Sequence, residues 1–488
     1  MGKNQDNLFH VYFFSAVLFF LPIYLLFGFF PSIVNFSLYK TPNPEFFPLF
    51  NNYWSLGNTG IESFLLTFLS LLYVVLIFYF NNFILKTKIR NYGKKGSYIF
   101  SLFLGTFILI WFYNNLDTYG FYWQFKKYDF YNLNSWIFCI FYLLLFNISI
   151  STKSLKKNYL VFFALFSFCS LIPVGFIQQY DFEFFAIPAL GILSQTQLNE
   201  IYFQYDLLIP ILIALWKLVG FEIYNFYIFL NIVLFLYLLG LFKLLKSLIS
   251  SRYILSLGIF SIIFLRYCLI DMKFGSTFIQ YSPLRADLWI ILALFASTLG
   301  LKSNKIFLAL IVMLVFSFNN GVLYLIAYFL TLLVFEALDS KRINTSIFVK
   351  WIKANISKFI IGFVVVLLVY TFIYSLGENI GTKQFLKYSI QSNKIQKFSI
   401  IWISLLSIGF FSGFISQRFE TIERRKLETY VFLIFLTIIN FTFCFYKNTI
   451  LSFISVSTSY LVLLFIFFDL NSEVLKKIVR NFKYSNAL

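Results

Sequence analysis

The chain has 488 residues, of which 60% are hydrophobic and only 12% charged, and its formal net charge is +19. A soluble domain has roughly 45–50% apolar and about 25% charged residues, so the composition excludes a soluble globular protein. Apolar runs of about 15–20 residues recur along the chain, which suits membrane helices and not the short alternating strands of a β-barrel. The sequence therefore predicts an all-α polytopic membrane protein without a large soluble domain.

The sequence gives little indication of a site built from histidine or cysteine. The single histidine is His10, which excludes His-based catalytic triads and multi-His metal sites. The four cysteines, Cys139, Cys169, Cys268 and Cys444, each fall inside an apolar run and show no CxxC spacing. The pattern therefore indicates neither a disulfide framework nor a zinc site.

In chain order, the breaks between apolar runs predict about fourteen membrane-spanning helices. We expect them near 11–30, 61–80, 98–114, 134–151, 159–178, 221–242, 253–269, 286–300, 306–319, 322–337, 358–376, 399–416, 430–446 and 450–468. A further apolar segment, 206–219, is short and contains Pro210 and Lys217. If it spanned the membrane, the basic stretch 243–252 would face outward, so we expect it to lie along the outer membrane surface.

The charge pattern predicts the orientation of the chain. With the N-terminus inside, this topology assigns the whole net charge of +19 to the cytoplasmic side and leaves the outer side neutral. That is the positive-inside distribution, so the basic composition requires no nucleic-acid partner. We expect membrane lipids as partners, both termini in the cytoplasm, and a bacterial inner membrane as the location.

Acidic residues gather in the outer loop after the fifth predicted span, which reads QQYDFEFFAIPALGILSQTQLNEIYFQYD. Asp181 and Glu183 come within a few residues of the membrane exit, and Glu200 and Asp206 follow. A carboxylate at the boundary between hydrocarbon and water is costly unless it is solvated, paired or functional. A solvated loop acid is the ordinary alternative at each of these positions.

The order of elements in this loop resembles the first outer loop of the GT-C superfamily of membrane glycosyltransferases. That group uses polyprenyl-phosphate sugars and includes protein O-mannosyltransferases and lipid A aminoarabinose transferases. Its loop has an early Asp, a small-residue stretch with Pro and Gly, an aromatic and Gln element, and a surface helix that ends near a Gly. The corresponding elements here are Asp181, Pro188 to Gly191, Tyr202 to Tyr205, and the segment 206–219 followed by Gly220.

The resemblance covers about 159–340 and continues more weakly to 468. It implies three regions, which are an N-terminal four-helix region (1–157), a GT-C-like catalytic core (158–340) with its first outer loop at 179–220, and C-terminal helices (341–488) with an outer loop at 377–398. The implied activity is inverting transfer of a sugar from a polyprenyl-phosphate donor to a glycan, lipid or protein acceptor on the outer, periplasmic face.

The resemblance and the available chemistry also suggest roles for residues. Asp181 is the expected catalytic base, and Asp181 and Glu183 could hold a divalent cation such as Mg²⁺ or Mn²⁺. The expected donor-binding residues are Gln204, Tyr205, Tyr281, Arg285, Asn319, Asn320, Lys383 and Lys387. Arg285 is the preferred phosphate contact because a guanidinium fork matches phosphate oxygens, although an ordinary interface anchor is an alternative role.

The sequence departs from the family in having four helices before the core and no large C-terminal outer domain. Two other functions stay open. A lipid-linked glycan flippase or transporter would show pseudo-symmetric halves and mid-span charges, which are nearly lacking in the predicted spans. A glycan polymerase or ligase would show a larger outer loop with several arginines. A scaffold role without catalysis is the remaining alternative.

Overall fold

The computed structural model describes residues 55–57, 68–76, 78, 179–197, 201, 203, 207–263, 282–339, 345–371, 389–391, 408–409, 411–413, 415, 421–447 and 457–471. The predicted spans 11–30, 98–114, 134–151 and 159–178 lie outside these residues, as do both chain ends and most of the predicted span 399–416.

The regular secondary structure in the described part of the chain is helical apart from one pair of very short strands. The helices are α8 (Gln179–Leu193), α9 (Leu208–Leu218), η3 (Ile223–Asn225), α10 (Phe226–Leu248), α11 (Arg252–Ile263), α12 (Pro283–Ala286), α13 (Trp289–Leu299), α14 (Asn304–Phe316), α15 (Phe318–Asp339), α16 (Thr345–Val369), α19 (Arg424–Lys447) and α21 (Thr458–Leu470). A further helical stretch covers 68–76. The strands β1 (Ser55–Gly57) and β2 (Ser389–Gln391) pair antiparallel, with Leu56 opposite Ile390.

Three helices in the described residues are long and apolar enough to cross a membrane, namely Ile223–Leu248, Asn320–Asp339 and Phe348–Val369. An α-helix rises 1.5 Å per residue, so about 20 residues cover the roughly 30 Å hydrocarbon core of a bilayer. Shorter apolar helices lie beside them at Trp289–Leu299, Asn304–Phe316 and Thr458–Leu470. These helices confirm the class predicted from composition, which is an α-helical membrane protein.

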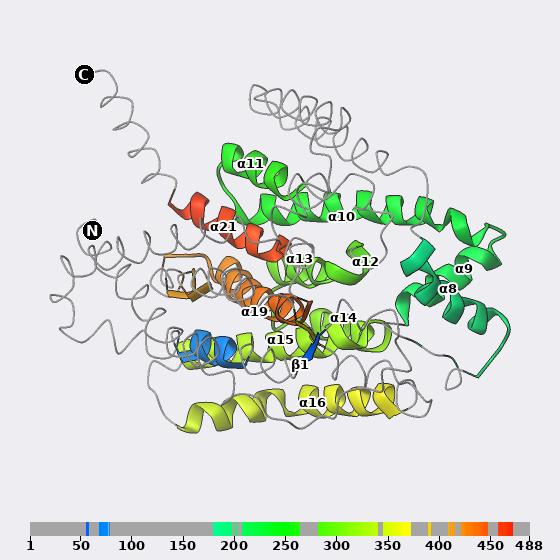
Figure 1. Cartoon of the computed structure of the whole chain (residues 1–488). Helices are drawn as coiled ribbons and strands as arrows, with labels where there is room; N and C mark the ends of the chain where they lie inside the picture. Colours follow the sequence, from blue (N-terminus) through cyan, green and yellow to red (C-terminus); the bar gives the residue numbers. More distant parts are fainter. Residues whose placement is uncertain are drawn as a thin grey trace, which may run out of the picture.

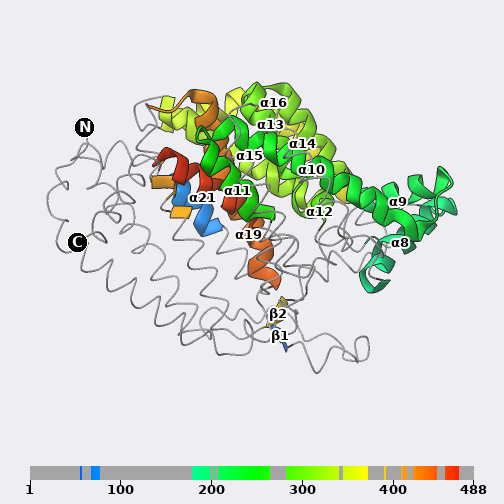
Figure 2. The same ribbon diagram turned by 90° about the horizontal axis from the view of Figure 1, so that it is seen from above.

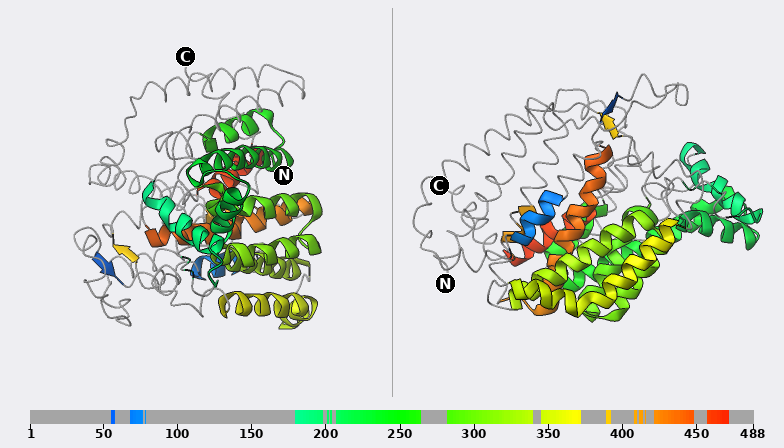
Figure 3. Two further views of the ribbon diagram at one scale, coloured as in Figure 1. Left: turned by 90° about the vertical axis from the view of Figure 1, so that its right-hand side faces the viewer. Right: turned by 90° about the horizontal axis from the view of Figure 1, so that it is seen from below.

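The long helices lie side by side in one bundle (Figure 1). In that view α10 and α11 lie at the top, α13, α19 and α21 in the middle, and α15 and α16 at the bottom. The pair α8 and α9 lies beyond one end of the bundle in Figures 1 and 2 and in the right-hand view of Figure 3. We call this end the α8–α9 end. At the opposite end, α10, α13, α15 and α21 finish while α11, α14, α16 and α19 begin.

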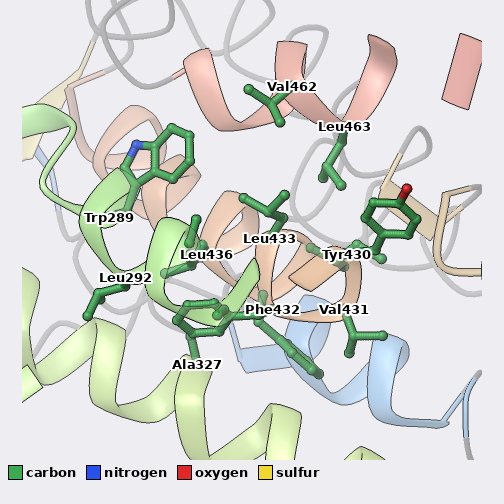
Figure 4. Close-up of a cluster of buried hydrophobic side chains, with 14 of the residues drawn as sticks. Trp289, Leu292, Ala327, Tyr430, Val431, Phe432, Leu433, Leu436, Val462 and Leu463 are labelled. Atoms are coloured by element: carbon green, nitrogen blue, oxygen red, sulfur yellow. The ribbon is translucent and has the colours of Figure 1, made fainter. Parts of the chain in front are cut away.

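The core of the bundle is centred on α19. Every residue from Val431 to Leu436 is fully buried. These residues pack against Trp289 and Leu292 of α13, Ala327 of α15 and the helix α21 (Figure 4). A helix that is buried on all sides lies at the centre of its neighbours. Because lipid tails are as apolar as leucine, close packing and not the release of water holds such a core together.

Side chains of α21 and α19 bind the turn between α10 and α11. The carboxylate of Asp469 accepts hydrogen bonds from the backbone nitrogens of Ser250 and Ser251, each at 2.8 Å. The hydroxyl of Tyr430 donates to the backbone oxygen of Leu248 at 3.0 Å. Asp469 thus places a negative charge at the N-terminus of α11, where the helix dipole favours it.

A second network joins α13, α15 and α19. The guanidinium of Arg424 donates to both oxygens of Asp339 at 2.8 Å, and its Nε donates to Glu428 at 3.2 Å. Glu428 also accepts a 3.1 Å hydrogen bond from the backbone nitrogen of Leu301. Burial lowers the pKa of Arg424, but its hydrogen bonds and charge interactions with Asp339 and Glu428 outweigh this, so the pKa is raised.

These two networks lie at the same end of the bundle. The turns and helix ends found there carry most of the basic residues in the described chain. The lysines and arginines there are Lys243, Lys246, Arg252, Lys302, Lys305, Lys350, Lys353, Arg424, Arg425 and Lys426. We call it the basic end of the bundle. The segments that the charge pattern assigned to one side of the membrane therefore lie together in the fold.

Candidate functional site

The helices α8 and α9 form a hairpin at the α8–α9 end. Phe182 and Phe185 of α8 pack with Ile209 and Ile213 of α9, and Phe226 at the start of α10 completes this cluster. The segment 179–193, which was expected as part of an outer loop, is therefore helical. The hairpin is fixed to the bundle because α9 leads through a short turn into α10.

The sequence correctly predicted that the helix in segment 206–219 would end at Gly220. The backbone nitrogen of Gly220 donates to the oxygen of Lys217 at 2.9 Å, and that of Phe221 donates to Trp216 at 3.3 Å. This is the Schellman pattern, and Gly220 has the positive φ of 100° that favours glycine. The indole of Trp216 then stacks on Phe221 with ring centroids 4.2 Å apart.

Asp181 lies in the first turn of α8, and Glu183 follows in the same helix. Residues two apart lie on opposite faces of an α-helix, so Asp181 and Glu183 occupy opposite faces of α8. Phe182, between them, is buried in the hairpin cluster, and Leu284 of α12 packs against that same cluster. The start of α8 and the short helix α12 therefore contribute to one region of the α8–α9 end.

A polar cluster lies where α12 meets the turn between α14 and α15. We call it the Arg285–Asn320 cluster, and it comprises Ser282, Arg285, Asp287, Ser317 and Asn320. The side-chain nitrogen Nδ2 of Asn320 donates to the backbone oxygen of Arg285 at 2.8 Å and to Oγ of Ser317 at 3.1 Å. Arg285 is only 9% exposed and Asp287 only 1%. The cluster thus holds a guanidinium and a carboxylate, both buried, near one end of a membrane bundle.

Asp287 is placed by the start of α13. Its Oδ1 accepts a hydrogen bond from Nε1 of Trp289 at 3.2 Å, and its backbone oxygen accepts one from Ile290 at 3.1 Å. Trp289 is itself fully buried, so the indole orients the carboxylate. Asp287 also lies next to the N-terminus of α13, where the helix dipole favours a negative charge.

The position of Asn320 depends on its neighbour Gly321. The helices α14 and α15 come so close that a Cβ on Gly321 would lie 2.6 Å from the Cα of Leu314. Only glycine permits this approach without a backbone shift. The sequence Phe318-Asn319-Asn320-Gly321 therefore folds tightly back on α14, and Asn320 reaches across to α12.

A second apolar cluster ties the chain after the hairpin to the same end. Ile201, Phe203 and Leu207 pack with Phe318 of α15 and Val369 of α16. Ile201, Phe203 and Leu207 therefore lie beside the start of α15 and the end of α16. This cluster flanks the Arg285–Asn320 cluster because Phe318 is two residues from Asn320.

The structure therefore joins two of the predicted donor-binding residues, Arg285 and Asn320, and places the backbone of Asn319 beside them in α15. The predicted residues Gln204, Tyr205, Tyr281, Lys383 and Lys387 lie outside the described residues. No role was predicted from the sequence for Ser282, Asp287 or Ser317. Their signal in the sequence is weak, because each is a single polar residue next to a helix boundary.

A metal site finds no direct support in the geometry. Among the residues that the structure describes, no three His, Cys, Asp or Glu side chains come together in a group that could hold an ion. A divalent cation at Asp181 or Glu183 stays a proposal.

No protein-family model, no curated protein and no solved structure matches this chain. The resemblance to the GT-C superfamily therefore rests on the order of sequence elements alone.

Proposed function

We propose that this chain is an integral-membrane glycosyltransferase that moves a sugar from a polyprenyl-phosphate donor to an acceptor on the outer face of a bacterial inner membrane. The observation that carries the proposal is the 2.8 Å hydrogen bond between Asn320 and the backbone of Arg285. It joins two turns that the sequence singled out separately as donor-binding. Both turns lie at the same end of the bundle as the hairpin that carries Asp181.

In the proposed orientation about fourteen helices span the membrane, both termini are cytoplasmic, and the basic end faces the cytoplasm. The charges at the two ends support this orientation. The basic end carries lysines and arginines from five helices, whereas Lys217 at the α8–α9 end is paired with Glu222 at 3.0 Å. The α8–α9 end then faces outward.

The hairpin is suited to lie in the outer membrane interface. Its exposed side chains include Leu218 and Val219, which are 71% and 73% exposed, together with the polar pair Lys217 and Glu222. Apolar and charged side chains together at a helix end are typical of segments that lie at the boundary of the bilayer. A lipid-anchored phosphate lies at this same depth, so the hairpin would meet the donor there.

The proposed reaction is a single displacement at the anomeric carbon. The carboxylate of Asp181 takes the proton from an acceptor hydroxyl, and the hydroxyl oxygen attacks the anomeric carbon from the face opposite the phosphate. A new carbon–oxygen bond forms as the bond to the phosphate oxygen breaks, and the polyprenyl phosphate leaves with the electron pair. The product therefore has inverted configuration.

The Arg285–Asn320 cluster would hold the leaving phosphate. A guanidinium can donate two parallel hydrogen bonds to phosphate oxygens and balance the charge that develops as the bond breaks. Asn320 fixes the backbone of Arg285, and Asp287 beside it keeps the region polar. Gln204, Tyr205, Tyr281 and Asn319 are proposed as further donor contacts.

The remaining proposed contacts, Lys383 and Lys387, follow α16 in the chain. α16 ends at Val369, which packs at the α8–α9 end with Phe318. The segment that carries these lysines therefore starts from the end where we place the donor. If a divalent cation takes part, it would be bound through Asp181 or Glu183 and would add positive charge beside the phosphate.

The experiment that tests the proposed function is a transfer assay with purified protein in liposomes. A panel of polyprenyl-phosphate sugars, labelled in the sugar, is added with a native membrane extract as the source of acceptor. The proposal predicts release of polyprenyl phosphate and movement of the label to an acceptor, and Arg285→Ala should weaken donor use. The matched control is Lys217→Ala, an exposed cation at the same end, which should keep wild-type turnover. Absence of both products from folded protein with every donor would contradict the proposal.

A further inference from the structure

Lys358 is a cation within a candidate membrane span, in the middle of α16. Its ammonium donates a 2.9 Å hydrogen bond to the hydroxyl of Tyr328 on α15. It also lies 5.6 Å from the ring centroid of Tyr328 and 5.8 Å from that of Phe307 on α14. Lys358 is therefore held at the junction of three helices.

The partners of Lys358 within the described residues do not neutralise its charge. A tyrosine hydroxyl and two aromatic faces stabilise an ammonium, but they carry no negative charge. The carboxylates at the nearby end of α15 do not provide this negative charge. Asp339 binds Arg424, and Glu336 forms no ion pair within the described residues. An ammonium has three donors, so Lys358 can still bind an anion.

The depth of this ammonium is set by the start of α14. Phe307 lies in the first turn of α14, which begins at Asn304. Lysine side chains on a helix point back toward its N-terminus, so Lys358 reaches toward the basic end. The exposed residues Lys302 and Lys305 lie at that same start of α14. The positive end of the α14 dipole adds to these charges.

A second, independent observation comes from Trp351. It lies seven residues before Lys358 and so on the same face of α16, in the direction in which the lysine points. Trp351 is 7% exposed, and its indole Nε1 is buried with no hydrogen-bond partner among the described residues. A buried donor without an acceptor is unfavourable, and an oxygen from a bound headgroup would satisfy it.

The outer face of α16 is apolar. Ile361 and Leu368 are exposed, and Ile361 lies three residues after Lys358, so the two residues are neighbours on the surface of α16. In Figure 1, α16 forms the lower edge of the bundle. An anion with acyl chains could therefore place these chains along α16, whereas a free phosphate ion would gain nothing from this surface.

We propose that the surface between α14 and α16 at the basic end binds one anionic phospholipid. Its phosphate binds Lys358 beside the start of α14, an oxygen of its headgroup region accepts from Nε1 of Trp351, and its acyl chains lie along Ile361 and Leu368 of α16. This site is separate from the proposed transferase site, which lies at the opposite end of the bundle.

Native mass spectrometry of the full chain in a neutral detergent tests this proposal. Phosphatidylglycerol and phosphatidylcholine are titrated separately, and the apparent affinity for the first bound lipid is compared. We expect wild-type protein to prefer phosphatidylglycerol, and Lys358→Gln to weaken that binding about tenfold, the loss expected for a charge-assisted hydrogen bond. Lys243→Gln, which removes an exposed lysine of α10 at the same end, should bind as wild type.

A second variant and an ion control complete the test. Trp351→Phe keeps the aromatic ring but removes the donor, so it should weaken phosphatidylglycerol binding severalfold even if Lys358→Gln fails to fold. Inorganic phosphate should not displace the lipid. Wild-type affinity in Trp351→Phe and Lys358→Gln, equal affinity of wild type for the two lipids, or complete displacement by phosphate would each overturn the proposal.

Discussion

Gly321 lies directly against the backbone of Leu314, so that an added Cβ would sit 2.6 Å from both the Cα and the nitrogen of Leu314. Neither atom belongs to a flexible side chain, so the contact can be relieved only if α14 and α15 separate. This close approach brings Asn320 within reach of Arg285. The packing of two helices and the geometry of the candidate site are therefore linked through one glycine.

Gly321→Ala should lower the free energy of unfolding by about 1–3 kcal/mol because it overpacks the junction of α14 and α15. It should also weaken donor use, since it moves Asn320. The control is Gly240→Ala in α10, where a Cβ would meet only the Leu294 side chain at 3.5 Å, an ordinary contact. Thermal unfolding in one detergent measures both variants. Equal stability of the two would show that the close approach of Gly321 to Leu314 has no energetic weight.

Asn320→Ala removes two hydrogen bonds, one to the backbone of Arg285 and one to Ser317. We expect a loss of about 1–3 kcal/mol in stability, from roughly 0.5–1.5 kcal/mol for each bond, together with weaker donor use. Asn355→Ala is the matched control, because Asn355 donates a similar 3.0 Å bond to the backbone of Trp351 on α16. That control should lose stability without a change in donor affinity. If both variants bind the donor equally well, Asn320 has only a structural role.

At the basic end, Glu428→Ala should destabilise the fold by about 1–3 kcal/mol, because it leaves the buried nitrogen of Leu301 without its acceptor. Glu222→Ala breaks an ion pair whose side chains are 39% and 70% exposed, so it should change stability by less than about 1 kcal/mol. Thermal unfolding of the two variants gives the comparison. A larger effect of Glu222→Ala would mean that the hairpin, and not the Glu428 network, limits the stability of the fold.

The orientation of the bundle can be tested by cysteine labelling in a background that lacks the four native cysteines. Val219→Cys at the end of α9 and Lys302→Cys between α13 and α14 are both exposed positions at opposite ends of the bundle. An impermeant maleimide added to intact cells should label Val219→Cys and not Lys302→Cys. The reverse labelling pattern would invert the proposed topology and move the candidate site to the cytoplasm.

Hydropathy predicted the central helices well but not all of their ends. The expected spans 286–300, 306–319 and 322–337 correspond closely to α13, α14 and α15. In contrast α16 begins at Thr345, well before the expected span 358–376, and contains Lys350 and Lys353. Hydropathy detects only the part of a helix that matches hydrocarbon, so a helix that continues past the membrane boundary is read as a loop.

The candidate site was predictable only in part. The predicted membrane topology places the turns that carry Arg285 and Asn320 on the same side of the membrane. Both residues could therefore be assigned to one site from the sequence. Their hydrogen bond could not be predicted, because it joins a side chain to a backbone oxygen 35 residues away. The burial of Asp287 depends on the packing of Trp289, and no local pattern in the sequence specifies that packing.

The most direct test of the proposed function is the rate of sugar transfer by Asp181→Asn. The substitution keeps the size of the side chain and removes the base, so it should reduce turnover by about 10²–10⁴-fold if Asp181 deprotonates the acceptor. Transfer from the labelled polyprenyl-phosphate donor is measured in liposomes with equal amounts of folded protein, and Glu183→Gln serves as the neighbouring control. We predict a severe loss of turnover in Asp181→Asn and a smaller one in Glu183→Gln. Near-wild-type turnover of folded Asp181→Asn would contradict both the assignment of the base and the proposed mechanism.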